Sequence, residues 1–197
     1  EGWNGNWTYE RDKMITIYDY EGNLHDYLKK HKRLEYLHVV NLALHLAIQI
    51  AELAKFNKGL LCINMKDIIV SGNGFIISNL SNAVSINCNN KILLSESHLL
   101  DHCIPELSAP ELSAPELNAP ELSAPELSAP ELSANKDNLA QSIREIHISA
   151  VYYSIALVCL KCLHIDEEMN EIHGSKLYYL LQRCLRSDPM EREFLYI

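Results

Sequence analysis

The sequence predicts an α+β fold that is mainly α-helical. Three segments carry apolar residues at helical spacing, and two pairs of short β-prone segments are each joined by a polar or glycine-rich turn. With 197 residues, of which 48% are hydrophobic, the chain is long enough to bury a core of its own. We therefore expect one domain of mixed secondary structure.

The first twenty residues predict a β-hairpin. Trp7–Glu10 and Met14–Tyr18 are rich in β-prone residues, and the polar segment Arg11–Lys13 separates them as a turn. A Gly-Asn pair then precedes a short predicted helix, Leu24–His31.

A long amphipathic helix is predicted at about Glu35–Phe56. Gly59 follows it closely and is the expected C-terminal cap, because glycine adopts the left-handed conformation without steric cost. The apolar residues at helical spacing, which we expect to face the core, are Leu37, Val40, Leu44, Ala47, Ile48 and Ala51.

Two short strands follow, at about Asp67–Val70 and Phe75–Ile77. The four residues between them, Ser71–Gly74, include two glycines and an asparagine, which is a strong hairpin signal. The next segment, Asn82–Cys103, is polar and predicts irregular structure.

A five-residue repeat occupies residues 105–134. Pro-Glu-Leu recurs six times, from Pro105 to Leu132, mostly followed by Ser-Ala. A period of five matches neither a helix nor a strand, and each proline removes an amide donor. Because each Ser-Ala-Pro-Glu unit resembles a capping box, single helical turns remain open within a mobile loop. We interpret most copies as an acidic spacer rather than a multivalent ligand.

The last part of the chain is predicted to be helical. Ile146–Leu163 is apolar nearly all round, which is typical of a helix buried at the centre of a domain, and Ser175–Leu185 predicts a further amphipathic helix. Cys159 and Cys162 form a Cys-x-x-Cys pair inside the first of these helices. With no second pair nearby, buried packing is favoured over a zinc or redox site.

The charge of −9 is unevenly distributed. Between Ile92 and Asn135 there is no Lys or Arg, and Glu96, Asp101 and six repeat glutamates give −8, so the remainder carries −9 − (−8) = −1. This acidic segment disfavours nucleic acid and anionic membranes and favours a basic protein partner. The sequence shows no signal peptide and starts with Glu1, so we expect a cytoplasmic fragment or processed product with reduced thiols.

Several motifs together resemble the large lobe of the protein kinase superfamily. The resemblance implies a hairpin and hinge remnant at residues 1–21, two halves of the lobe at 22–104 and 135–197, and the repeat at 105–134 between them. It also implies that the hairpin at 67–77 lies near the former active site. The segments that carry it resemble the catalytic loop (Lys58–Val70), the Asp-Phe-Gly strand (Ile77–Ser81), the Ala-Pro-Glu motif (the repeats), the central helix (Tyr153–Ala156) and the C-terminal ending (Leu180–Arg192).

The positions that would carry phosphoryl transfer are degenerate. Cys62 stands where the family has the Asp that orients the substrate hydroxyl. Asp67 replaces the metal-binding Asn, and Asn79 replaces the Asp of Asp-Phe-Gly. A neutral amide is a poor Mg²⁺ ligand. We therefore expect no enzyme, no cofactor and no metal, although by family the activity would be that of a protein serine/threonine or tyrosine kinase.

One structural pair of the family is expected to persist. The Glu of the Ala-Pro-Glu motif pairs with a buried Arg near the chain end, which here is Arg192. Only one repeat glutamate can take this role, and Glu106 or Glu111 is expected to do so.

The resemblance implies a catalytically inactive, pseudokinase-like signalling module that binds a protein partner through its acidic or helical surface. The kinase non-catalytic C-lobe (KIND) domain, associated with actin-nucleator and signalling assemblies, is a similar module. Two alternatives stay open. One is a truncated kinase with residual ATP binding, and the other is a helical domain of unrelated fold, which would be favoured if Phe75–Ile77 did not pair with Asp67–Val70.

Overall fold

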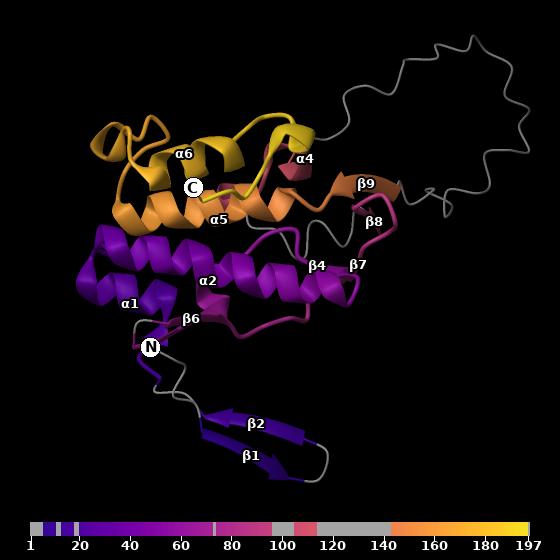
Figure 1. Ribbon diagram of the computed structural model, residues 1–197, viewed down its shortest axis with the longest axis horizontal. Coiled ribbons are helices and arrows are strands. Elements are labelled where there is room, and N and C mark those ends of the chain that lie inside the picture. The colour runs from indigo at the N-terminus through magenta and orange to yellow at the C-terminus, as the bar shows by residue number, and fades with distance from the viewer. Residues whose placement is uncertain are drawn as a thin grey trace, which may run out of the picture.

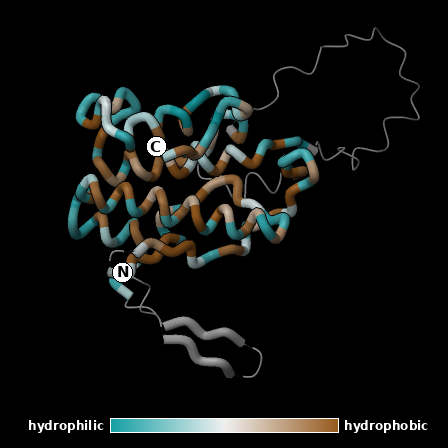
Figure 2. Tube along the Cα trace, in the orientation of Figure 1, coloured by the Kyte–Doolittle hydropathy of each residue, from teal (hydrophilic) through white to brown (hydrophobic). Residues whose placement is uncertain are grey.

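Two helices, α2 (Tyr36–Lys55) and α5 (Ala150–Leu163), pack against each other at the centre of the molecule (Figure 1). The computed structural model describes residues 6–10, 13–17, 20–72, 74–95, 105–113 and 143–196. On the far side of α5 lies α6 (Lys176–Cys184), and on the far side of α2 lies a small sheet with α1 (Leu24–His31) beside it. Figure 2 shows hydrophobic stretches concentrated in α2 and α5, whereas the loops around α6 are largely hydrophilic.

Local capping explains where the short helices begin. The Asn23 side chain accepts a hydrogen bond from the Asp26 amide at the start of α1, and Ser175 accepts one from the Tyr178 amide at the start of α6. Both helices therefore lie where the sequence predicts them.

The small sheet contains three antiparallel strands. In it β5 (Ile68–Ser71) pairs with both β3 (Gly22–Asn23) and β6 (Gly74–Ile77). The predicted hairpin is confirmed, and its first turn residue, Gly72, has a positive φ of 54°. The N-terminal hairpin is also present, as β1 (Asn6–Glu10) and β2 (Lys13–Ile17), with Lys13 in the strand. Its turn residues, Arg11 and Asp12, lie outside the described residues.

The face of α2 that meets the core agrees with the prediction only at Val40, which is buried, and at Leu44, which packs against the core. The buried side chains are Val39, Val40, Leu42, Ala43, Leu46 and Ile50. By contrast, Leu37 and Ile48 are 71% and 59% exposed, and Ala51 is exposed as well. The helix carries apolar residues on both sides, so its periodicity did not decide which stripe packs against α5 and β6.

Gly59 does not cap α2. The helix ends at Lys55, and Asn57 takes the left-handed conformation with a φ of 54°. Gly59 instead belongs to β4 (Lys58–Gly59), which pairs with β7 (Val84–Ser85). A Cβ atom at Gly59 would lie 3.1 Å from Ile86 Cδ1, so a larger residue here would press against the Ile86 side chain.

The prediction of irregular structure over Asn82–Cys103 was wrong for part of that segment. It contains β7 and β8 (Lys91–Ser95), and β8 pairs antiparallel with β9 (Ile143–His147). The residues from Ile146 to Ser149, predicted as helix, therefore belong to β9 and to the turn that follows it.

The first two copies of the repeat belong to the fold rather than to a loop. Pro105–Leu107 forms a 3₁₀ turn and Pro110–Ser113 forms α4, so single helical turns occur as the capping pattern allows. Leu107 is buried in the main core, and Leu112 lies in a smaller core with β8 and β9. A mobile spacer is thus the wrong description of these two copies, and the later copies lie outside the described residues.

Within the described ranges, α2 is the one helix whose length and composition would allow it to cross a membrane, which the sequence analysis did not anticipate. A third of its most apolar window (33%) is buried in the protein. Core helices pass the same test, and α2 packs against α5 and β6.

Candidate functional site

The loop between β4 and β5 holds two of the three degenerate positions, Cys62 and Asp67. The central helix anchors this loop, because the Ile63 amide donates a buried hydrogen bond of 2.9 Å to the Ser154 hydroxyl of α5. Farther along, the Asn64 side chain accepts from the Lys66 amide at 3.0 Å and begins the 3₁₀ turn Met65–Asp67. The loop is therefore held at both its start and its end.

The third degenerate position lies beside the second. The Asn79 amide group donates to Asp67 Oδ1 at 3.4 Å, a long hydrogen bond. The Asp67 backbone oxygen also accepts from the Ser78 amide, at 2.8 Å, and from the Ser78 hydroxyl, at 3.0 Å. The end of β6 is thus tied to the end of the loop, and Cys62 lies half-buried earlier in the same loop.

This arrangement offers little to a cation. Asp67 contributes one carboxylate, and one of its oxygens already faces the Asn79 amide. The Asn79 side-chain oxygen in turn accepts from the Ser81 amide at 3.0 Å. Among the described residues, no three His, Cys, Asp or Glu side chains are grouped so that they could hold a metal ion.

A second group of polar side chains lies elsewhere in the fold, where Arg192 meets Glu111. Both guanidinium nitrogens of the fork contact the carboxylate, Nη1 to Oε1 at 2.5 Å and Nη2 to Oε2 at 2.9 Å. Of the two glutamates expected for this pair, the structure therefore selects Glu111, while Glu106 is exposed. The Arg192 side chain is 0% exposed and that of Glu111 is 24% exposed.

Two further donors of Arg192 also have partners. Its Nε donates to the Arg186 carbonyl at 2.7 Å and its Nη2 donates to the Ser187 carbonyl at 3.1 Å. The guanidinium carbon lies 5.0 Å from the centre of the Tyr153 ring, so α5 covers one face of the pair. A buried charge with this many partners is a structural element.

The Cys-x-x-Cys pair lies in the core. Cys159 and Cys162 are both 0% exposed within α5. Burial raises the pKa of Cys162 to about 12 and raises the pKa of Cys159 well above its ordinary value. Thiols held neutral in this way are poor metal ligands and poor nucleophiles, in keeping with a packing role.

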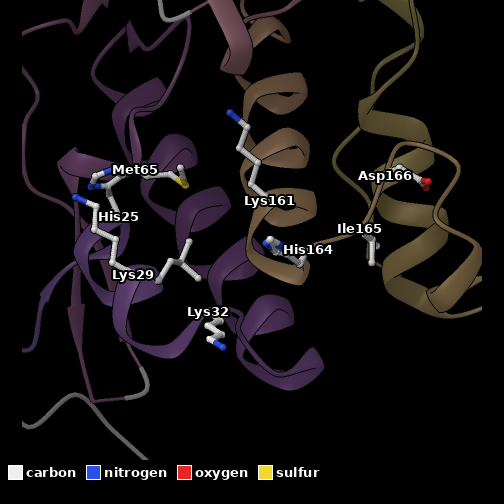
Figure 3. Close-up of a pocket in the computed structure, with 9 residues that line it drawn as sticks. His25, Lys29, Lys32, Met65, Lys161, His164, Ile165 and Asp166 are labelled. Atoms are coloured by element: carbon white, nitrogen blue, oxygen red, sulfur yellow. The ribbon is translucent and has the colours of Figure 1, made fainter.

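A basic cleft lies beside the loop (Figure 3). It has a volume of about 610 Å³ and is bounded by α1, by Met65 and by the end of α5. The basic side chains that line it are His25, Lys29, Lys32, Lys161 and His164, and the one acidic lining residue is Asp166. The cleft could not be predicted from the sequence, because the residues that line it come from three distant segments.

Ser154 and Gln49 were missed as well. Gln49 of α2 donates to the Phe75 carbonyl at 2.9 Å and accepts from the Ile77 amide at 2.8 Å, so it pairs with β6 as a neighbouring strand would. The available signal for both was a polar side chain flanked by apolar residues in a helix, since such a side chain, when buried, needs a partner.

A comparison with models of known protein families finds none that matches this chain, and a comparison with curated proteins finds no significant match. The function is therefore inferred from the residues and their geometry.

Proposed function

We propose that this chain is a catalytically inactive, kinase-like large lobe that works as a protein-interaction module. The observation that carries the proposal is that the scaffolding contacts are retained while the carboxylates needed for chemistry are missing. Glu111 and Arg192 keep a bidentate, largely buried pair, whereas Asp67 is the one carboxylate among the three aligned catalytic positions.

The order of elements supports the kinase-like part of the proposal. A short helix, a long helix, an anchored loop and a tight hairpin precede the Glu111 segment, and a buried central helix follows it. The loop is hydrogen-bonded to the central helix through Ser154, and the pairing of β5 with β6 disfavours the unrelated helical fold considered above.

The absence of chemistry is argued from electrostatics. Transfer of a γ-phosphoryl group needs metal ions that neutralise the phosphate oxygens, and Mg²⁺ prefers carboxylate ligands. Cys62 offers a thiol and Asn79 offers an amide whose oxygen is already hydrogen-bonded, so the aligned positions do not assemble such a site.

The exposed face of α2 and the acidic segment support the interaction part. Leu37 and Ile48 leave aliphatic side chains on one face of α2, and Phe56 just beyond the helix is 75% exposed. Large exposed apolar side chains are enriched where proteins meet partners. A KIND-like domain of signalling assemblies is one form that such a module could take.

A nucleotide-binding test separates this proposal from a truncated kinase with residual ATP binding. The chain is heated with millimolar ATP and either Mg²⁺ or Mn²⁺ while its unfolding is followed. We expect no rise in the unfolding temperature. A rise of several degrees that Asp67→Ala abolishes would favour the residual pocket instead, because a ligand stabilises only the state that binds it. Transfer of γ-phosphate by the purified chain would refute the proposal.

A further inference from the structure

The basic cleft combines an apolar floor with a cationic rim. Leu28 of α1, Met65 of the catalytic-type loop and Ile165 after α5 supply the apolar surface. Around them stand Lys29, Lys32 and Lys161, with imidazoles from α1 and from the end of α5. Such a surface fits a ligand in which carboxylates flank an aliphatic side chain.

The lysine amines are available to a ligand. Lys29 lies 3.5 Å from Asp26 and is 66% exposed, so that ion pair is weak. Within the described part of the chain, the amines of Lys32 and Lys161 make no ion pair. In Figure 3, Lys161 extends from α5 toward Met65, while Asp166 lies on the far side of Ile165. The acidic residue therefore does little to neutralise the middle of the cleft.

Helix ends explain part of this arrangement but not all of it. α1 ends at His31 and α5 ends at Leu163, and cations are favoured near the carbonyl end of a helix. That preference accounts for the positive charge of Lys29 and Lys161 at these positions. It does not account for the half-buried apolar floor that three separate segments build between them.

The chain itself contains a segment of the complementary chemistry. From Pro115 to Ala134 it carries four further Pro-Glu-Leu copies without a Lys or Arg, so a glutamate is followed by a leucine every five residues. In the second copy, Glu111 already pairs with Arg192 and Leu112 is already buried, whereas these later copies lie outside the described residues.

The chain's own repeat could reach the cleft, because residues 114–142 are long enough to span the molecule and return, but a second molecule offers a shorter route. The later copies lie between α4 and β9, and β9 leads directly into the first turn of α5. The cleft is at the other end of α5, which a helix of 14 residues places about 21 Å away. Figure 1 shows α4 and β9 at the end of the molecule opposite to α1. A neighbouring copy can present its repeat at the cleft without the chain having to run the length of its own body and back.

We propose that the basic cleft binds the Pro-Glu-Leu copies of residues 115–134 from a second copy of this chain, with leucine on the apolar floor and glutamate against the lysines. This proposal names the partner of the proposed interaction module, and it rests on the protein-binding part of that proposed function. The kinase-like assignment is tested separately by nucleotide binding and phosphate transfer, so the two can fail independently.

The test compares two charge-reversal variants with equal change of net charge. Lys29→Glu, Lys32→Glu and Lys161→Glu together reverse the rim of the cleft. Lys30→Glu, Lys55→Glu and Lys66→Glu reverse three lysines that do not line it. Circular dichroism of both variants establishes that they fold. A third variant replaces Glu116, Glu121, Glu126 and Glu131 by Gln, which keeps the length of the repeat and leaves Glu111 intact.

Sedimentation measures self-association, and a labelled peptide of residues 124–133 measures binding. We expect the parent chain to associate with rising concentration and less so in high salt, and the glutamine variant and the cleft variant to remain monomeric. Peptide affinity for the cleft variant should fall about tenfold or more, with little change in the control variant. A peptide with Gln for Glu should bind weakly.

Three outcomes would overturn the proposal. The first is a parent chain that stays monomeric at several hundred micromolar. The second is equal peptide binding by the cleft variant and the control variant. The third is association that persists when the four repeat glutamates are neutral, which would assign it to another surface such as the exposed face of α2.

Discussion

Arg192 Nη2 lies 2.9 Å from Glu111 Oε2, so the second copy of a five-residue repeat is fixed to the last turn of the chain. The two residues are 81 positions apart, so the contact joins distant parts of the chain. The second copy is thereby distinct from the first, whose Glu106 is exposed.

Glu111→Gln should destabilise the fold strongly, because it leaves the buried Arg192 charge without its counter-ion. Removing one partner of such a pair costs about 3–5 kcal/mol. The free energy of unfolding measured in urea should fall accordingly. Glu106→Gln is the matched control, since the same substitution five residues earlier falls on an exposed side chain and should change stability by less than about 0.5 kcal/mol. Equal losses in the two variants would contradict the assignment of the pair to Glu111.

Leu107→Ala tests whether the first copy of the repeat is part of the core. Leu107 is 2% exposed and belongs to the same cluster as α2 and α5, so its truncation should cost about 2–5 kcal/mol. Leu93→Ala is the control, because Leu93 is 55% exposed and its loss should be small. If Leu107→Ala unfolded in the same urea concentration as the parent chain, the first copy would have to be a spacer after all.

The sequence predicts the elements that depend on neighbouring residues. The caps Asn23 and Ser175 stand next to the helices that they begin, and the Gly72 turn stands between the strands that it joins. Each signal is complete within a few residues, so tertiary contacts were not needed to read it.

The errors concern partners that are distant in sequence. β8 becomes a strand by pairing with β9, for instance Leu94 opposite Arg144, and the polar segment around β8 has little β-pattern of its own. The choice between the two apolar stripes of α2 likewise depended on α5 and β6. The basic cleft was invisible for the same reason, since Lys29, Met65 and Lys161 meet only in the folded chain.

The pair of Glu111 and Arg192 is an intermediate case. The family resemblance limited the partner of Arg192 to two repeat glutamates but did not choose between copies of identical sequence. The choice follows from packing, because the turn that buries Leu112 also directs Glu111 toward Arg192.

Ser154→Ala should loosen the loop between β4 and β5 from α5. Without the hydroxyl, the Ile63 amide loses its acceptor in a buried position, which costs about 1–3 kcal/mol. Hydrogen exchange gives a local readout, because protection of the Ile63 amide should drop more than that of amides in the middle of α6. Uniform loss of protection would instead indicate a general packing defect.

Stability should decrease as the pH falls from 7.5 to 5.5. Desolvation lowers the pKa of His45, and desolvation followed by the charge of Arg192 lowers the pKa of His147. In the unfolded chain a histidine titrates near 6.5. Below about this pH the unfolded state therefore binds more protons than the folded state, and the free energy of unfolding falls until the lowered folded-state pKa is passed.

His45→Asn tests the contribution of His45 to this effect. His45 Nδ1 accepts a hydrogen bond from the Phe75 amide at 3.3 Å, and protonation of that nitrogen would break the bond. Asparagine has an oxygen that can accept in its place but does not titrate, so the variant should show a shallower dependence of unfolding free energy on pH. The measurement is a set of urea titrations at half-unit steps of pH. Parallel curves for the variant and the parent would show that His45 does not cause the acid sensitivity and would leave His147, beside the Arg192 charge, to be tested in the same way.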